Sequence, residues 1–250
     1  MNSASISAFS VAAAYDRLHR TGLLAIALLI GGISSAWAET AEPRGGRVGW
    51  ARIITPNTAW NRHAEADPTL TQFIRRETSL NIDPTWYSAD PASVEQLCSY
   101  PLLFTNNLTD VKNPAHWKNF TEYLQRGGFI FIDSCINLGI TPDPDRFLER
   151  HIALMKTIAP RAEVRELPKN HDIYRNYFAM REAPPHTFHQ NVFRKNWAKH
   201  GLYGVYEGDR MISLISLSGL QCGFAGTHTR PHAEECMKMV VNVYVYTMTR

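Results

Sequence analysis

Five residues near the middle of the chain, Phe129 to Asp133, constrain the fold more than any other segment. Every position is apolar until the terminal acid, which is typical of a parallel strand covered on both faces. A helical segment that begins at Pro114 comes before it and ends at Gly127-Gly128, where glycine suits a C-terminal cap. The segment therefore predicts a parallel α/β sheet.

Strand-like and helix-like segments alternate four times in the first half of the chain, which predicts right-handed crossovers. The predicted strands cover residues 47–54, 82–87, 100–105 and 129–133, and the predicted helices begin at Pro68, Pro91, Pro114 and Pro144. Asp67 is predicted to be an N-cap because Pro68 suits the first helical position.

The second half is less regular. The pattern predicts strands over 162–167, 202–206 and 210–216, a short aromatic helix over 173–178, a polar insertion at 183–200 and a closing helix over 231–249. We therefore expect a single three-layer α/β domain with a mainly parallel sheet.

The first 38 residues have the pattern of a secretory signal peptide. Arg17 and Arg20 precede the apolar run 23–30, and Ala36-Trp37-Ala38 matches a cleavage pattern. The predicted organisation is a signal peptide at 1–38, a linker at 39–46 and the α/β domain at 47–250, in a periplasmic or secreted protein. An uncleaved membrane anchor is the alternative, since the uncharged stretch is at the short limit for a bilayer span. No later apolar run approaches that length, so no stable span is expected after cleavage.

Charge and cysteine content limit the classes of partner and cross-link. The chain has 26 Lys and Arg against 23 Asp and Glu, and the leader removes two basic residues and one acidic residue, which leaves +2. That balance argues against nucleic acid or an anionic membrane as a partner. The cysteines after the leader are Cys98, Cys135, Cys222 and Cys236. An oxidising compartment permits disulfides, and their pairing stays open.

Ligand-binding residues are expected at the carboxyl ends of the strands, where open parallel sheets hold their ligands. This rule selects Trp60, Asn106, Asn107 and Asp133. Asp133 ends a strongly apolar strand, so its carboxylate must be solvated, hydrogen-bonded or paired. Two interpretations stay open for it: a ligand-positioning acid, or a cap for the turn at 134–139.

The candidates for catalysis are Asp133, Cys135, His171 and His189. Cys135 follows the strand at the place of an elbow nucleophile, but Ile136 and Asn137 fit the strained elbow turn poorly. His171 precedes Asp172, yet adjacent residues on a helix do not face each other. A turn is the simpler interpretation of that pair.

No metal or cofactor is expected. Two histidine pairs have chelating spacings, His186 with His189 and His228 with His232. Nearby prolines place both pairs in loops, and neither spacing matches a common zinc or iron motif. The sequence also lacks glycine-rich nucleotide loops and the serine-hydrolase elbow.

An ordered set of segments gives the chain a resemblance to a known family. The strongest motif is Leu124-Gln-Arg-Gly-Gly-Phe-Ile-Phe-Ile-Asp133, and the others are Gly46-Arg-Val, the Trp60 loop, Leu70 to Ile74, Leu102-Leu-Phe104, Ile173-Tyr174, Gly201 to Met211 and Val241 to Tyr246. Through them the chain resembles the DUF4159 family, a bacterial domain of unknown function. The resemblance implies a flavodoxin-like or class I glutamine amidotransferase-like fold. It also implies an envelope role, because members often occur beside von Willebrand-type and ATPase components. Cys135 lacks the flanking glycines of an amidotransferase, so that activity is not expected.

Two functional hypotheses follow. The first is a non-catalytic periplasmic domain that binds a small molecule or an envelope protein at the carboxyl edge, beneath the insertion at 183–200. The second is a hydrolase of an amide or glycan-related substrate that uses Asp133 or Cys135 with a histidine such as His171 or His189. Replacing Asp133 by alanine is expected to abolish binding or activity and leave the fold intact; loss of folding would favour the capping role.

Overall fold

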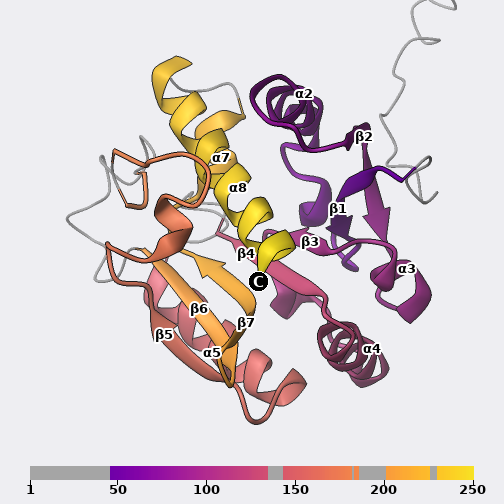
Figure 1. Ribbon diagram of the computed structural model, residues 1–250. Coiled ribbons are helices and arrows are strands. Elements are labelled where there is room, and N and C mark those ends of the chain that lie inside the picture. Colours follow the sequence, from indigo (N-terminus) through magenta and orange to yellow (C-terminus); the bar gives the residue numbers. More distant parts are fainter. Residues whose placement is uncertain (1–45, 135–142, 182, 186–200, 226–229) are drawn as a thin grey trace, which may run out of the picture. The chain divides into compact units, whose positions relative to one another are not determined.

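The predicted alternation of strands and helices forms a sheet that is mainly parallel (Figure 1). The computed structural model describes residues 46–134, 143–181, 183–185, 201–225 and 230–250. The strands in these residues are β1 (Val48–Ile53), β2 (Ile82–Ala89), β3 (Leu102–Thr105), β4 (Phe129–Asp133), β5 (Glu163–Glu166), β6 (Leu202–Glu207) and β7 (Arg210–Ser216). They lie in the order β2-β1-β3-β4-β7-β6-β5.

The strands β2, β1, β3, β4 and β7 are parallel to one another, β6 pairs antiparallel with β7, and β5 pairs antiparallel with β6. The strand order reverses between β1 and β3, because β2 lies on one side of β1 and β3 on the other. Such a switch point opens a crevice at the carboxyl ends of the strands. The loops that follow β1, β3, β4 and β7 are therefore the places where a ligand-binding site is expected.

Helices cover both faces of the sheet and complete a flavodoxin-like three-layer α/β domain (Figure 1). One face packs against α2 (Asp67–Glu77), α7 (Leu220–Phe224) and α8 (Arg230–Thr249), and the other packs against α3 (Val94–Cys98), α4 (Pro114–Gln125) and α5 (Pro144–Ile158). Side chains of β4 alternate between the two cores, with Phe131 in one and Ile132 in the other. Within the described residues, no helix combines the length and the apolar character that a membrane span needs.

Several local predictions are confirmed. Gly127 ends α4 with a left-handed φ of 98°, as expected for a glycine cap. The β6–β7 hairpin, the β5 strand and the closing helix α8 form where the pattern predicts them. The predicted helix over 173–178 is wrong, since only a 3-10 turn at Asp172–Tyr174 forms (η4).

A tertiary contact explains the missing helix. The buried side chain of Asn242, in α8, accepts a hydrogen bond from the Phe178 N–H and donates one to the Phe178 carbonyl, both at 2.8 Å. These bonds occupy the backbone groups that a helix would need. Packing against α8 therefore overrides the local helical pattern.

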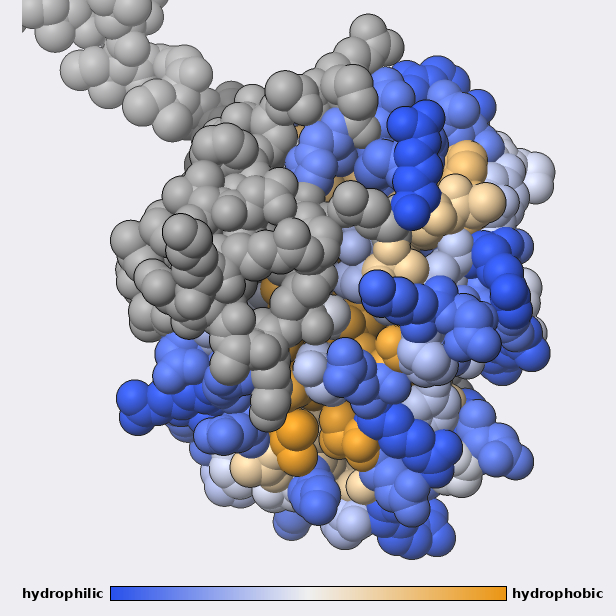
Figure 2. All heavy atoms as spheres, turned by 90° about the vertical axis from the view of Figure 1, so that its left-hand side faces the viewer, coloured by the Kyte–Doolittle hydropathy of each residue, from blue (hydrophilic) through white to orange (hydrophobic). Residues whose placement is uncertain are grey.

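The outer strand β5 is protected against pairing with other chains. It has four residues, and three of them, Glu163, Arg165 and Glu166, are charged and exposed. Charged side chains on a short edge strand discourage edge-to-edge association. Figure 2 shows this side of the molecule, where hydrophilic side chains predominate among the coloured residues and the apolar area is smaller.

A buried histidine on α5 makes the stability depend on pH. His151 is fully buried; the Leu108 N–H donates to its Nε2 at 3.2 Å, and its Nδ1 lies 2.8 Å from the Phe147 carbonyl. Burial lowers the pKa of His151 to about 4. A histidine in the unfolded chain titrates near ~6.5, so between these values the unfolded chain binds more protons and stability rises with pH.

We expect the His151 contribution to be complete above about pH 6.5 and to be lost as the pH falls toward 4, with a total of about 3 kcal/mol. Urea unfolding at a series of pH values measures it. His151→Gln keeps an acceptor for the Leu108 N–H but does not titrate, so this variant should have a smaller pH slope. Equal slopes for both proteins would show that other groups cause the acid sensitivity.

Candidate functional site

Asp133, at the carboxyl end of β4, caps a distant helix. Its carboxylate is fully buried and accepts hydrogen bonds from the backbone N–H groups of Leu220 at 3.0 Å and Gln221 at 2.8 Å. These are the first two residues of α7, which the sequence analysis did not predict. A carboxylate is favourable at this position because it satisfies N–H groups that a helix leaves unpaired.

A chain of side-chain amides joins β3 to the loop after β1. Asn106 is buried, and its Nδ2 donates to the Asp133 carbonyl at 3.1 Å and to Gln221 Oε1 at 2.9 Å. The Nε2 of Gln221 donates to the carbonyl of Arg62 at 3.2 Å. Three loops at the carboxyl edge are thus tied together through side chains that are buried in the fold.

A buried ion pair holds the loop after β1. Arg52 donates from Nε and Nη2 to the two carboxylate oxygens of Asp67, and both side chains are fully buried. Its Nη1 donates to the carbonyls of Trp60 and Arg62, each at 3.0 Å. The guanidinium also lies 5.0 Å from the ring centre of Phe104. The prediction that Asp67 is an N-cap is wrong: it is the first residue of α2, and its carboxylate serves Arg52 instead.

We refer to Arg52, Asp67, Asn106, Asp133 and Gln221 as the edge network. It links β1, β3 and β4 to α2 and α7, and so fixes the ends of three adjacent strands. Preorganised polar frames of this kind position the groups that contact a ligand.

Three buried polar atoms, one in the edge network and two beside it, have no hydrogen-bond partner among the described residues. They are Asn106 Oδ1, Ser134 Oγ and Ser218 Oγ. Ser134 follows β4, and its N–H donates to the Ser216 carbonyl at 2.9 Å. Ser218 follows β7, and its N–H donates to Ser216 Oγ at 3.1 Å. We call these three the unpaired edge atoms; they come from the ends of three neighbouring strands.

Two further ligand candidates, Trp60 and Asn107, lie at the same edge but make contacts only with nearby parts of the fold. The Trp60 side chain is half-buried, with its ring centre 6.4 Å from that of Trp86. Asn107 accepts hydrogen bonds from the N–H and the hydroxyl of Thr109 and caps the turn at Leu108–Asp110. The structure therefore places Asn106 and Asp133 in direct contact and leaves Asn107 outside the edge network.

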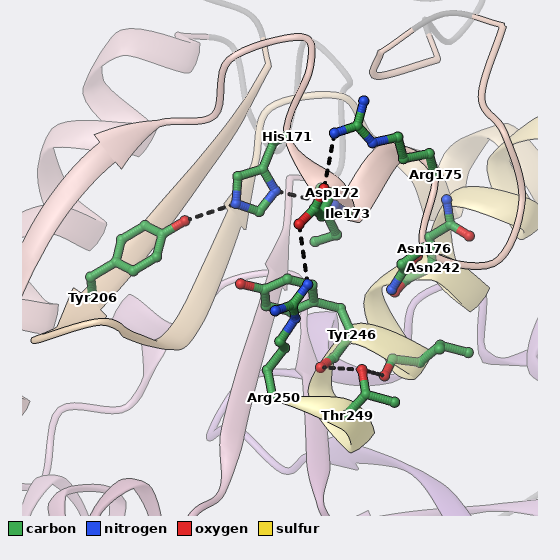
Figure 3. A network of polar contacts seen from close by, with 11 residues as sticks. His171, Asp172, Ile173, Arg175, Asn176, Tyr206, Asn242, Tyr246, Thr249 and Arg250 are labelled. Carbon is green, nitrogen blue, oxygen red and sulfur yellow. Dashed lines mark hydrogen bonds and ion pairs between the residues drawn. The ribbon is translucent and has the colours of Figure 1, made fainter.

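His171 belongs to a different cluster, which Figure 3 shows at the far end of α8. Its Nδ1 accepts from the Ile173 N–H and its Nε2 lies 3.2 Å from the Tyr206 hydroxyl. Burial lowers the pKa of the imidazole. The ring packs against Tyr246, ten residues along α8 from Cys236 and so about 15 Å away along the helix axis. The structure does not bring His171 to Asp133.

Two side chains of α8, Cys236 and His232, lie near the carboxyl edge. Their Sγ and Nε2 atoms are 3.7 Å apart, and Gly223 of α7 leaves room for the buried thiol. Burial raises the pKa of Cys236, and the nearby Asp133 raises it further. The thiol is therefore protonated at neutral pH and is a poor nucleophile.

The other candidates lie outside the described residues: Cys135, His186, His189 and His228. Among the residues that the structure describes, no group of three or more His, Cys, Asp and Glu side chains could hold a metal ion.

The strand-end rule includes Ser134 in the segment after β4, but sequence reasoning did not choose it as a ligand-binding residue, and it missed Ser218 and Gln221. The same rule, applied to the end of β7, would have selected Ser218. Gln221 carries no such signal, because α7 has five residues and shows no helical periodicity.

The family model that matches this chain is that of DUF4159, described as a domain of unknown function, and it covers residues 50–248. The chain belongs to the DUF4159 family. The matched region of this DUF4159 domain includes the whole edge network and all three unpaired edge atoms. A comparison with curated proteins found no match.

Proposed function

We propose that this DUF4159 domain acts outside the cytoplasm and binds a small polar molecule at the carboxyl edge of its sheet, without catalysing a reaction. The observation that carries the proposal is the set of unpaired edge atoms on a rigid network. The location rests on the signal-peptide pattern of residues 1–38, which stays a prediction.

The energetic argument starts from the cost of unpaired polar groups. A buried donor or acceptor without a partner costs about 1–3 kcal/mol, and native interiors contain few of them. Three such atoms at adjacent strand ends lower the stability of the unliganded fold. A ligand that supplies hydrogen bonds to them would restore that free energy on binding. Open parallel sheets bind ligands beyond the carboxyl ends of their strands, and Asn106 follows β3, one of the two strands at the switch point.

The chemistry of the site supports binding rather than catalysis. The Asp133 carboxylate is committed to α7, and the Cys236 thiol is held protonated by burial. His171 lies at the other end of α8, against Tyr246. The unpaired edge atoms are an amide oxygen and two hydroxyl oxygens, which are neutral hydrogen-bonding groups.

A thermal-shift screen of the purified protein tests the proposal, with metals, sugars, peptidoglycan fragments and amino acids as probes. A bound ligand raises the melting temperature in proportion to RT ln(1 + [L]/Kd). We expect a shift that disappears in Ser218→Ala, which lacks an unpaired edge atom. The shift should persist in the control Ser213→Ala, whose hydroxyl donates to the Ile130 carbonyl inside the sheet. If no probe raises the melting temperature, the proposal of small-molecule binding is overturned, and an envelope protein becomes the expected partner.

A further inference from the structure

The orientation of the Asn106 amide is fixed by its neighbours. Gln221 directs its Nε2 to the Arg62 carbonyl, so its Oε1 faces Asn106. Asn106 meets Oε1 and the Asp133 carbonyl, and both of these accept hydrogen bonds. The nitrogen of Asn106 must therefore lie on that side, because a flipped amide would place its oxygen against two other oxygens.

This orientation decides the polarity of the site. The two Nδ2 hydrogens of Asn106 are used by Gln221 and Asp133, so the group left unpaired is Oδ1, a hydrogen-bond acceptor. The hydroxyls of Ser134 and Ser218 can donate or accept. A group that contacts Asn106 Oδ1 must bring an N–H or O–H of its own.

The charged groups of the edge network all have partners within the protein. Arg52 is paired with Asp67, and Asp133 is satisfied by two backbone N–H groups of α7. An anionic ligand would meet the acceptor oxygen of Asn106 without a cation of the network to compensate it. A buried charge without a partner is costly.

We infer that the ligand presents a neutral hydrogen-bond donor, an amide N–H or a hydroxyl, to Asn106, and that the site discriminates against carboxylates and phosphates. The inference rests on the proposed function and specifies the chemistry of its ligand. Amides and carbohydrates share this donor chemistry.

Saturation-transfer NMR on the purified protein tests the inference with four probes: acetamide, glucose, acetate and methyl phosphate. Acetamide and acetate form the decisive pair, because they have nearly the same shape and differ in charge and in the presence of a donor. We expect millimolar binding of acetamide or glucose, as is typical of very small ligands, and at least a tenfold preference over both anions. The signal should be lost in Ser218→Ala and kept in Ser213→Ala.

The outcomes separate the two claims. Binding of acetamide without glucose identifies an amide ligand, and the reverse identifies a hydroxylated one; both support the inference. Equal or tighter binding of acetate or methyl phosphate, sensitive to Ser218→Ala, overturns the inference and leaves the binding function intact. If none of the four probes binds, the inference is overturned. The proposed function is overturned as well only if no compound of the thermal-shift panel raises the melting temperature.

Discussion

Replacement of Arg52 by methionine is expected to lower the free energy of unfolding by about 3–5 kcal/mol, because it leaves a buried carboxylate unpaired. Asp67 is fully buried and receives two hydrogen bonds from the guanidinium. The carbonyls of Trp60 and Arg62 would lose their donor at the same time. A loss of this size corresponds to roughly 10 °C in melting temperature for a domain of about 200 residues. Urea and thermal unfolding measure the change.

Two controls isolate the buried pair. Arg76→Met breaks an exposed pair with Glu77 and should cost less than about 1 kcal/mol. The double variant Arg52→Met with Asp67→Leu removes both charges, and apolar replacements of buried pairs are often tolerated. The double variant should therefore lose less unfolding free energy than the sum of the losses in the two single variants. Additive losses would show that the two side chains are not energetically coupled.

Replacement of Asp133 by alanine is expected to lower the free energy of unfolding by about 3–6 kcal/mol. The change removes two charge-assisted hydrogen bonds, each worth about 1.5–3 kcal/mol, and leaves the buried N–H groups of Leu220 and Gln221 without their acceptor. This revises the expectation from sequence that the fold would survive intact. Urea unfolding gives the loss, and hydrogen exchange should show faster exchange at the start of α7.

Asp133→Asn keeps one acceptor oxygen and should cost less than the alanine variant. Asp172→Ala is a suitable control, since that carboxylate is exposed and pairs with Arg175 and Arg250 (Figure 3). It should be nearly neutral. An Asp133→Ala protein as stable as the parent would favour the other interpretation, in which the acid positions a ligand.

The fold was predictable because its signals are local. The apolar run from Phe129 to Ile132 fills both cores, which is why it indicates a strand covered on two sides. Gly127 ends α4 by adopting a left-handed conformation that glycine permits. These features depend on neighbours in sequence, and the pattern of residues reports them directly.

The edge network was less predictable because its partners are far apart in the chain. Asn106 and Gln221 are separated by 115 positions, and Asp133 and Gln221 by 88. Strand ends selected Asn106 and Asp133, and the structure shows the two in contact. The acceptor role of Asp133 depends on α7, which has no periodic pattern of its own. Asp67 was mispredicted for the same reason. Its position before Pro68 is typical of an N-cap, but in the folded chain its carboxylate accepts hydrogen bonds from Arg52.

The most direct test of the account is the stability of the hydroxyl deletions at the carboxyl edge. If the unpaired edge atoms are reserved for a ligand, Ser134→Ala and Ser218→Ala remove buried groups that contribute no hydrogen bond to the fold. Without ligand, both variants should then unfold at the same urea concentration as the parent or at a higher one. Ser213→Ala, which loses its bond to the Ile130 carbonyl, should cost about 1 kcal/mol. Losses in Ser134→Ala and Ser218→Ala as large as in Ser213→Ala would show that the protein itself satisfies these hydroxyls, and would contradict the binding site.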